Sequence, residues 1–165
     1  MLILQMKSQI NCDILFCQMW IKNDHVNFKF AQMLKDIIEQ EVKNIGIAIV
    51  KESNKENDWK VYLVNLTDTR LENIIINSTG FGLDNDNSSL QTATFRHYLE
   101  TLKPRTAIPF ETIMEEIFHL SNRFWLSFYI GNKIFEKKYE FVPGSITEKF
   151  FVSVPFTGKK GVMII

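Results

Sequence analysis

A β-hairpin can be assigned residue by residue in the second half of this chain. Residues 123–130 and 133–141 each alternate apolar and polar side chains, and Gly131-Asn132 joins them. Two linking residues of this kind favour the tight turns of hairpins, which need positive φ at their central positions. Successive side chains of a strand point to opposite faces, so this register pairs Phe128 with Phe135 on one face. The hairpin predicts an antiparallel sheet with one buried face.

The predicted register gives the two faces of the hairpin different chemistry. The other face sets Arg123 opposite Glu140 and places Lys138 beside Trp125, where a cation–π contact can form. We therefore expect the aromatic and apolar face to lie in the core. It comprises Phe124, Leu126, Phe128, Phe135, Tyr139 and Phe141.

The composition indicates one domain with a substantial core and no strong charge. Of the 165 residues, 45% are hydrophobic and 14 are Phe, while 19 basic and 19 acidic residues cancel. Such a balance creates no overall field that attracts nucleic acid or an anionic membrane. Cys12 and Cys17 are too few for a disulfide framework and lack the partners of a zinc site. We expect a cytoplasmic protein without a cofactor, a metal or a membrane contact.

An amphipathic helix is predicted over residues 28–45. Its apolar residues recur at helical spacing, from Phe30 through Ile37 to Ile45, and charged residues occupy the opposite side. Gly46 is a plausible residue to end it. We expect this helix to pack on the sheet, residues 1–26 to form an N-terminal extension, and residues 27–165 to form a single domain.

The remainder of the chain predicts short strands separated by turns. Strands are expected over residues 47–50, 59–66, 71–78, 91–99 and 105–113 before the hairpin, and over 149–156 and 161–165 after it. Residues 80–90 are rich in Gly, Asn, Asp and Ser and predict a long loop. Pro109 marks its strand as an edge or a bulge, and residues 114–120 predict a helical turn. The pattern predicts a mainly β fold, an antiparallel immunoglobulin- or fibronectin-like β-sandwich over residues 47–165.

No pattern in the chain predicts a catalytic or metal-binding residue. His25, His97 and His119 lie on different predicted elements, and none has the spacing of a metal site. The loop at residues 84–88 offers oxygen ligands, but it lacks the Gly and the Glu of a calcium-binding EF-hand. A catalytic function is therefore the less favoured hypothesis.

Two groups of residues remain as candidate contacts. Lys159 and Lys160, in the turn Gly158–Gly161, form with Arg96 a candidate site for an anion or a partner. Tyr98, Trp125 and Tyr129 form a candidate aromatic surface. The first hypothesis is a non-catalytic protein that binds another protein or helps to assemble a complex, in an unspecified oligomeric state. The alternative is a nucleic-acid-associated protein, which would need a basic concave face that joins the three cationic residues.

Several motifs together resemble a known family. They are residues 59–66 (WKVYLVNL), 96–99 (RHYL), 109–111 (PFE), 114–118 (MEEIF), 124–143 and 158–164. This set resembles a family of short uncharacterised bacterial proteins, some of which carry the name phenylalanyl-tRNA synthetase β subunit. The resemblance covers roughly residues 57–165. It implies no site residues, but its name adds an accessory role in tRNA aminoacylation to the alternative hypothesis.

Overall fold

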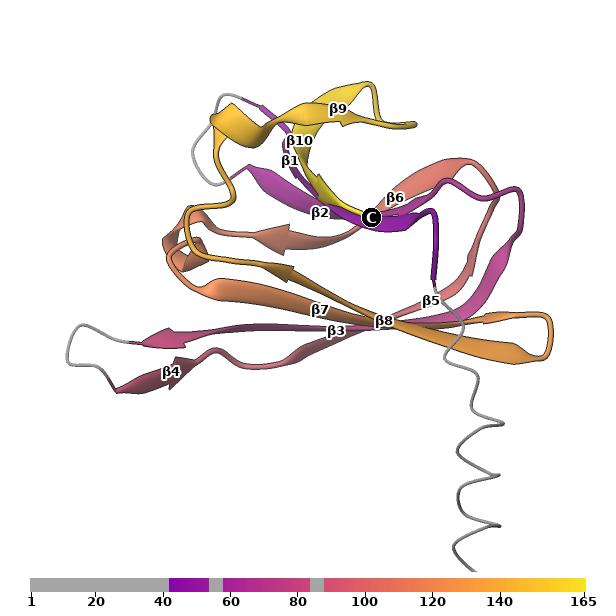
Figure 1. Cartoon of the computed structure of the whole chain (residues 1–165), viewed down its shortest axis with the longest axis horizontal. Helices are drawn as coiled ribbons and strands as arrows, with labels where there is room; N and C mark the ends of the chain where they lie inside the picture. Colours follow the sequence, from indigo (N-terminus) through magenta and orange to yellow (C-terminus); the bar gives the residue numbers. More distant parts are fainter. Residues whose placement is uncertain (1–41, 54–57, 84–87) are drawn as a thin grey trace, which may run out of the picture. The chain divides into compact units, whose positions relative to one another are not determined.

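The structure, a computed structural model, describes residues 42–53, 58–83 and 88–165. These residues form two antiparallel five-stranded sheets that lie one above the other (Figure 1). Sheet A has the order β6-β2-β1-β10-β9. In sheet B, β3 pairs with β7 and β7 with β8, while β4 and β5 share the other edge of β3. The fold is therefore mainly β and sandwich-like, as the strand pattern predicts.

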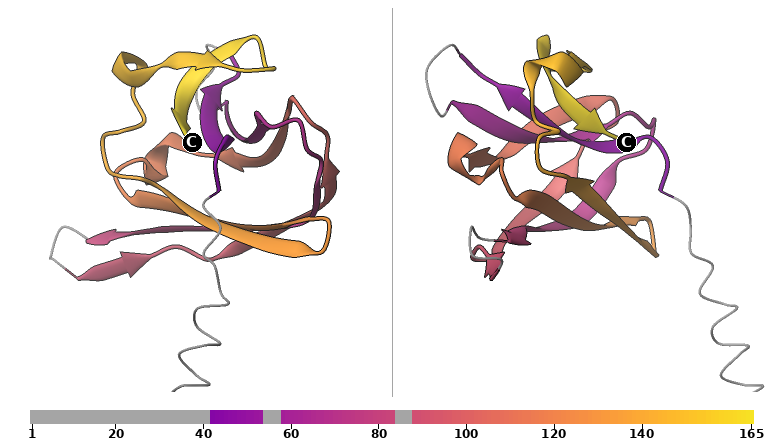
Figure 2. Two further views of the ribbon diagram at one scale, coloured as in Figure 1. Left: turned by 45° about the vertical axis from the view of Figure 1, so that its right-hand side comes forward. Right: turned by 60° about the vertical axis from the view of Figure 1, so that its left-hand side comes forward.

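The strands of sheet A are β1 (Ile45–Lys51), β2 (Trp59–Asn65), β6 (Thr106–Ile113), β9 (Val152–Val154) and β10 (Lys159–Ile164). The strands of sheet B are β3 (Leu71–Leu83), β4 (Ser89–Gln91), β5 (Phe95–Leu102), β7 (Ser121–Ile130) and β8 (Lys133–Phe141). Short 3₁₀ helices, η1 (Glu115–Ile117) and η2 (Glu148–Phe150), precede β7 and β9. In the turned views of Figure 2, the β9–β10 hairpin stays on the side of sheet A.

The main core lies between the two sheets. Side chains from both sheets meet there, among them Ile47 and Leu63 from sheet A and Phe124 from sheet B. A second, smaller cluster lies on the outer side of sheet A, around Val50 and Tyr62. Residues of β1 and β2 are thus buried on both faces, which explains why these strands are apolar at nearly every position.

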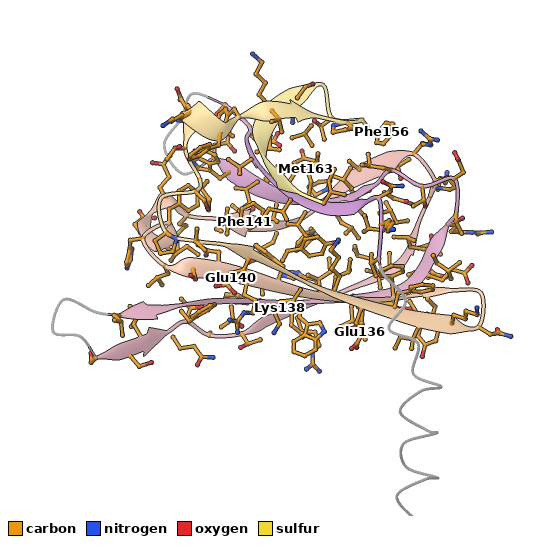
Figure 3. All side chains as sticks on the ribbon, viewed as in Figure 1. Glu136, Lys138, Glu140, Phe141, Phe156 and Met163 are labelled. Atoms are coloured by element: carbon orange, nitrogen blue, oxygen red, sulfur yellow. The ribbon has the colours of Figure 1, made fainter. Side chains whose placement is uncertain are left out.

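The β7–β8 hairpin has the predicted register. Phe128 pairs with Phe135, and Arg123 pairs with Glu140. Gly131 in the turn has a φ of 58°, as a tight hairpin turn requires. The predicted core face is largely buried, and Figure 3 shows Phe141 between the two layers.

The predicted helix 28–45 is wrong at its C-terminal end. Residues 42–44 are not helical, and Ile45 begins β1. Asn44 has a φ of 60°, which interrupts a right-handed helix. Ile45 is buried in the core and pairs with Asn65 of β2, so strand pairing outweighs the helical periodicity there. Residues 28–41 of this prediction, and the extension 1–26, lie outside the described residues.

The predicted loop 80–90 is also wrong in part. Residues 80–83 continue β3, and residues 89–91 form β4. The glycines in this stretch permit close packing, because a Cβ at Gly82 would lie 2.9 Å from Leu120 Cδ2. The predicted strand 91–99 is interrupted, since residues 92–94 leave the sheet before β5 begins. Residues 84–87 lie outside the described part of the chain.

The prediction for β6 is confirmed, and the prediction of strands over 149–156 and 161–165 is confirmed in part, because residues 148–150 form η2 and the strands are β9 and β10. β6 is an edge strand of sheet A, and its register shifts beside Pro109, as a strand proline predicts. β10 pairs with β1 on one side and β9 on the other, so the C-terminal segment is built into sheet A. The predicted helical turn appears as η1.

Candidate functional site

The outer side of sheet B carries large exposed apolar side chains at neighbouring positions. Because directly opposed residues share a face, Tyr98, Ile75 and Ser127 lie in one row across β5, β3 and β7. Trp125 lies in the next row, opposite Asn77. We call this surface the aromatic face, defined by Ile75, Tyr98, Trp125, Tyr129 and Ile134, all of which are exposed.

Hydrogen bonds and ring contacts hold side chains of the aromatic face in place. The ammonium group of Lys138 lies 5.1 Å from the ring centre of Trp125. The hydroxyl of Tyr98 donates to Asn73 Oδ1 at 3.1 Å. Anchored aromatic side chains lose little conformational entropy when a partner covers them, so this surface is suited to binding.

The charges on this side of sheet B balance. The basic side chains are Arg96, Arg123 and Lys138, and the acidic ones are Glu72, Glu136 and Glu140. Arg123 pairs with Glu140 at 3.2 Å, and Arg96 Nε donates to Asn77 Oδ1 at 2.9 Å. In Figure 3, Glu136, Lys138 and Glu140 follow one another along β8. A surface of this kind has no excess of positive charge for a phosphate backbone.

The structure separates the cationic residues named from the sequence. Arg96 lies on the aromatic face of sheet B, whereas Lys159 packs against Tyr62 on the outer side of sheet A. Lys160 is exposed on the other face of β10 from Lys159, opposite Ser153. These residues therefore do not share one concave basic surface.

Lys159 takes part in a compact polar cluster with Glu52 and Tyr62. Its ammonium group donates to Glu52, and the hydroxyl of Tyr62 donates to the same carboxylate at 2.6 Å. Burial alone would raise the pKa of Glu52, but these hydrogen bonds outweigh burial and lower it. Burial and the neighbouring carboxylate raise the pKa of Tyr62, so this phenol is not activated as a base. The cluster links the β1–β2 connection to the β9–β10 hairpin.

The two histidines of the described residues have different partners. His97 Nε2 lies 3.0 Å from Glu111 Oε2, and His119 Nδ1 lies 2.5 Å from the Glu116 carbonyl oxygen. His25 lies outside the described residues. Within residues 42–53, 58–83 and 88–165, no group of three or more His, Cys, Asp or Glu side chains is arranged to hold a metal ion. In the same ranges, no helix has the length and apolar character needed to cross a membrane.

A small pocket lies between the sheets, where the edge of β3 is left uncovered between β4 and β5. It has about 270 Å³ of empty space, including its opening to solvent, and Ser78 and Glu111 are among its lining residues. No sequence pattern brings these two residues together. They come from β3 and β6, which belong to different sheets.

No protein-family model, curated protein or solved structure matches this chain. The resemblance to short bacterial proteins therefore stays a prediction from the motifs in residues 59–164. The aromatic face and the pocket are surfaces of the described residues that a partner or a ligand can reach.

Proposed function

We propose that this protein is a non-catalytic interaction or assembly module that binds another protein through the aromatic face. The observation that carries the proposal is the exposure of Tyr98 (61%) and Trp125 (44%) on one side of sheet B. Isolated apolar residues are common on protein surfaces, but contiguous patches mark interaction sites. Here Ile75, Tyr129 and Ile134 extend the patch across the sheet.

The residue types of this surface support a protein partner. Trp, Tyr and Arg dominate the binding energy of protein interfaces, because they bury large areas and keep a polar group for hydrogen bonding. Trp125 occupies the middle of a row that runs from Arg96 to Lys138. The balanced charges around it can orient a partner and exclude a mismatched one.

The strand order supports an immunoglobulin- or fibronectin-like class for the sandwich. In such folds strands A, B and E share one sheet, and strands C, F and G share the other. If β1, β2, β3, β6, β7 and β8 are taken as A, B, C, E, F and G, the neighbours observed in the two sheets follow this rule. β4 and β5 then extend the second sheet beside C, and β9 and β10 extend the first sheet beyond A. Modules of this class are frequent in protein recognition, and we place this one in the cytoplasm on the expectation from its cysteine content.

A second candidate is association with nucleic acid, including an accessory role in tRNA aminoacylation. It is favoured by the way Arg96 and Lys138 flank Trp125 and Tyr98, since bases stack on aromatic side chains beside cationic groups. It is disfavoured by Glu136 and Glu140 on the same side of the sheet, which would repel phosphates. Protein binding is therefore the better supported function.

Affinity capture with mass spectrometry, with and without nuclease, tests the proposal. The tagged full chain is compared with a variant that carries Tyr98→Ser and Trp125→Ser. A matched control carries Phe150→Ser and Phe156→Ser, because these aromatic residues are similarly exposed, at 51% and 50%, but lie outside sheet B. We expect the same partner from the unmodified chain and from the control, whether or not nuclease is present.

Recovery of that partner should fall at least about tenfold with the Tyr98→Ser/Trp125→Ser variant, as expected when central aromatic anchors are lost. Equal recovery by both variants would refute the assignment of the aromatic face. Recovery that nuclease abolishes would favour the nucleic-acid candidate.

A further inference from the structure

An interruption of the strand pairing beside β3 forms the pocket. Residues 92–94 leave the sheet between β4 and β5, and Thr92 holds this bend against Gly80. The N–H of Thr92 donates to the Gly80 carbonyl at 2.9 Å, and its Oγ1 accepts from the Gly80 N–H at 2.8 Å. These bonds satisfy the backbone while leaving space next to the bend.

Ser78 supplies an unused polar group to this space. Ser78 is 5% exposed and lines the pocket, and its Oγ makes no hydrogen bond with any group in the described part of the chain. Native proteins pair nearly all buried hydroxyls, so an unpaired one in a pocket wall takes its partner from outside the chain, a water molecule or a ligand. The hydroxyl can accept a hydrogen bond from such a ligand or donate one to it.

Glu111 supplies negative charge to the same space. It lines the pocket from β6, and its side chain is 14% exposed. Its Oε2 lies 3.0 Å from His97 Nε2, but a carboxylate accepts several hydrogen bonds on its two oxygens. Arg123 also lines the pocket, and its charge is engaged elsewhere by Glu140 at 3.2 Å.

The other walls are apolar and partly aromatic. Phe95, Ile113 and Phe124 line the pocket, and aromatic faces attract cations. The empty space is small and its 270 Å³ includes the opening to solvent, so it suits a ligand of few heavy atoms.

We propose that this pocket binds a small organic ammonium ion, the protonated amine of a molecule with a short apolar tail. The ammonium group would donate hydrogen bonds to the Glu111 carboxylate and the Ser78 hydroxyl, and the tail would contact Phe95 and Phe124. An anion of the same size would be repelled by Glu111. A neutral hydrocarbon would leave the Ser78 hydroxyl unpaired.

An NMR titration of the ¹⁵N-labelled full chain with propylammonium chloride tests this proposal. We expect saturable shifts of the amide signals of Gly80, Thr92 and Ala93, which line the pocket. Sodium propionate and 1-propanol, added at the same concentration and ionic strength, should cause clearly smaller shifts. Absence of a saturable response, or an equal response to propionate, would overturn the proposal.

Matched variants test whether the Glu111 carboxylate binds the propylammonium ion. Glu111→Gln should weaken propylammonium binding at least about tenfold, because a charge-assisted hydrogen bond is lost. Glu136→Gln removes an exposed carboxylate from the outer side of sheet B and should leave binding unchanged. Ser78→Ala keeps the Glu111–His97 contact and should weaken binding without affecting the fold. Unchanged binding in both pocket variants, or an equal loss with Glu136→Gln, would refute the site.

Discussion

Phe128 lies inside the core between the sheets, with 1% of its surface exposed, and its ring stacks on Phe135 with 5.5 Å between the ring centres. Replacing it with Ala would remove buried apolar contacts and leave a cavity. We expect Phe128→Ala to lower the free energy of unfolding by about 3–5 kcal/mol. Urea denaturation measures this change, with Ile134→Ala as the control, because Ile134 is exposed on β8. A loss below about 1 kcal/mol for Phe128→Ala would contradict the assignment of the core face.

Tyr139 joins the two sheets through a buried hydrogen bond. Its hydroxyl donates to the Ile45 carbonyl at 2.7 Å, and burial raises the pKa of the phenol far above its usual value. The folded-state pKa exceeds the unfolded value of about 10. The contribution of Tyr139 to the free energy of unfolding is therefore complete below pH 10 and declines as pH rises further. Tyr139→Phe should cost about 1–3 kcal/mol at neutral pH, because the carbonyl loses its partner.

As the pH is raised from neutral to about 11, the free energy of unfolding should fall less for Tyr139→Phe than for the unmodified protein. Tyr62, whose pKa burial also raises, titrates in both proteins and therefore cancels in the comparison. Urea denaturation across this range provides the measurement. Parallel pH profiles would show that Tyr139 does not remain protonated in the folded state.

β10 crosses β1 so closely that only glycine fits at position 161. A Cβ there would lie 2.3 Å from the Ile49 carbonyl oxygen, a backbone atom that cannot move aside alone. We therefore expect Gly161→Ala to separate the strands and to lower stability by about 3 kcal/mol or more. Ser153→Ala on the exposed side of β9 should change stability by less than about 0.5 kcal/mol. Thermal unfolding of both variants provides the measurement, and equal melting temperatures would show that the C-terminal segment does not pair as described.

Among the elements, the β7–β8 hairpin could be predicted because its alternation and its turn residues specify the same register. The extent of β3 could not, because Gly80 and Gly82 resemble loop residues. Their role depends on Thr92 and Leu120, which are distant in sequence. The sequence also could not show that residues 42–45 are not helical, because an apolar residue such as Ile45 suits a helix face and a buried strand alike.

For the whole molecule, the sequence predicted an aromatic surface of Tyr98, Trp125 and Tyr129, but not Ile75 and Ile134, which extend it. Tyr98 and Trp125 come together only because β3 lies between β5 and β7. The same topology separates Arg96 from Lys159, which no local pattern reveals. The pocket was unpredictable for a similar reason, since Ser78 and Glu111 have ordinary strand neighbours and line one pocket only when the two sheets pack.

Our proposed function requires that another protein contacts the aromatic face of sheet B. Site-specific photocrosslinking in cells tests it most directly, with a benzoylphenylalanine residue introduced in place of Trp125 or, as a control, in place of Phe150. Both positions are exposed, but only the first lies on the aromatic face. We predict a discrete protein adduct from position 125 that resists nuclease, and none of that size from position 150. No protein adduct from position 125, or the same adduct from both positions, would refute protein binding by this face.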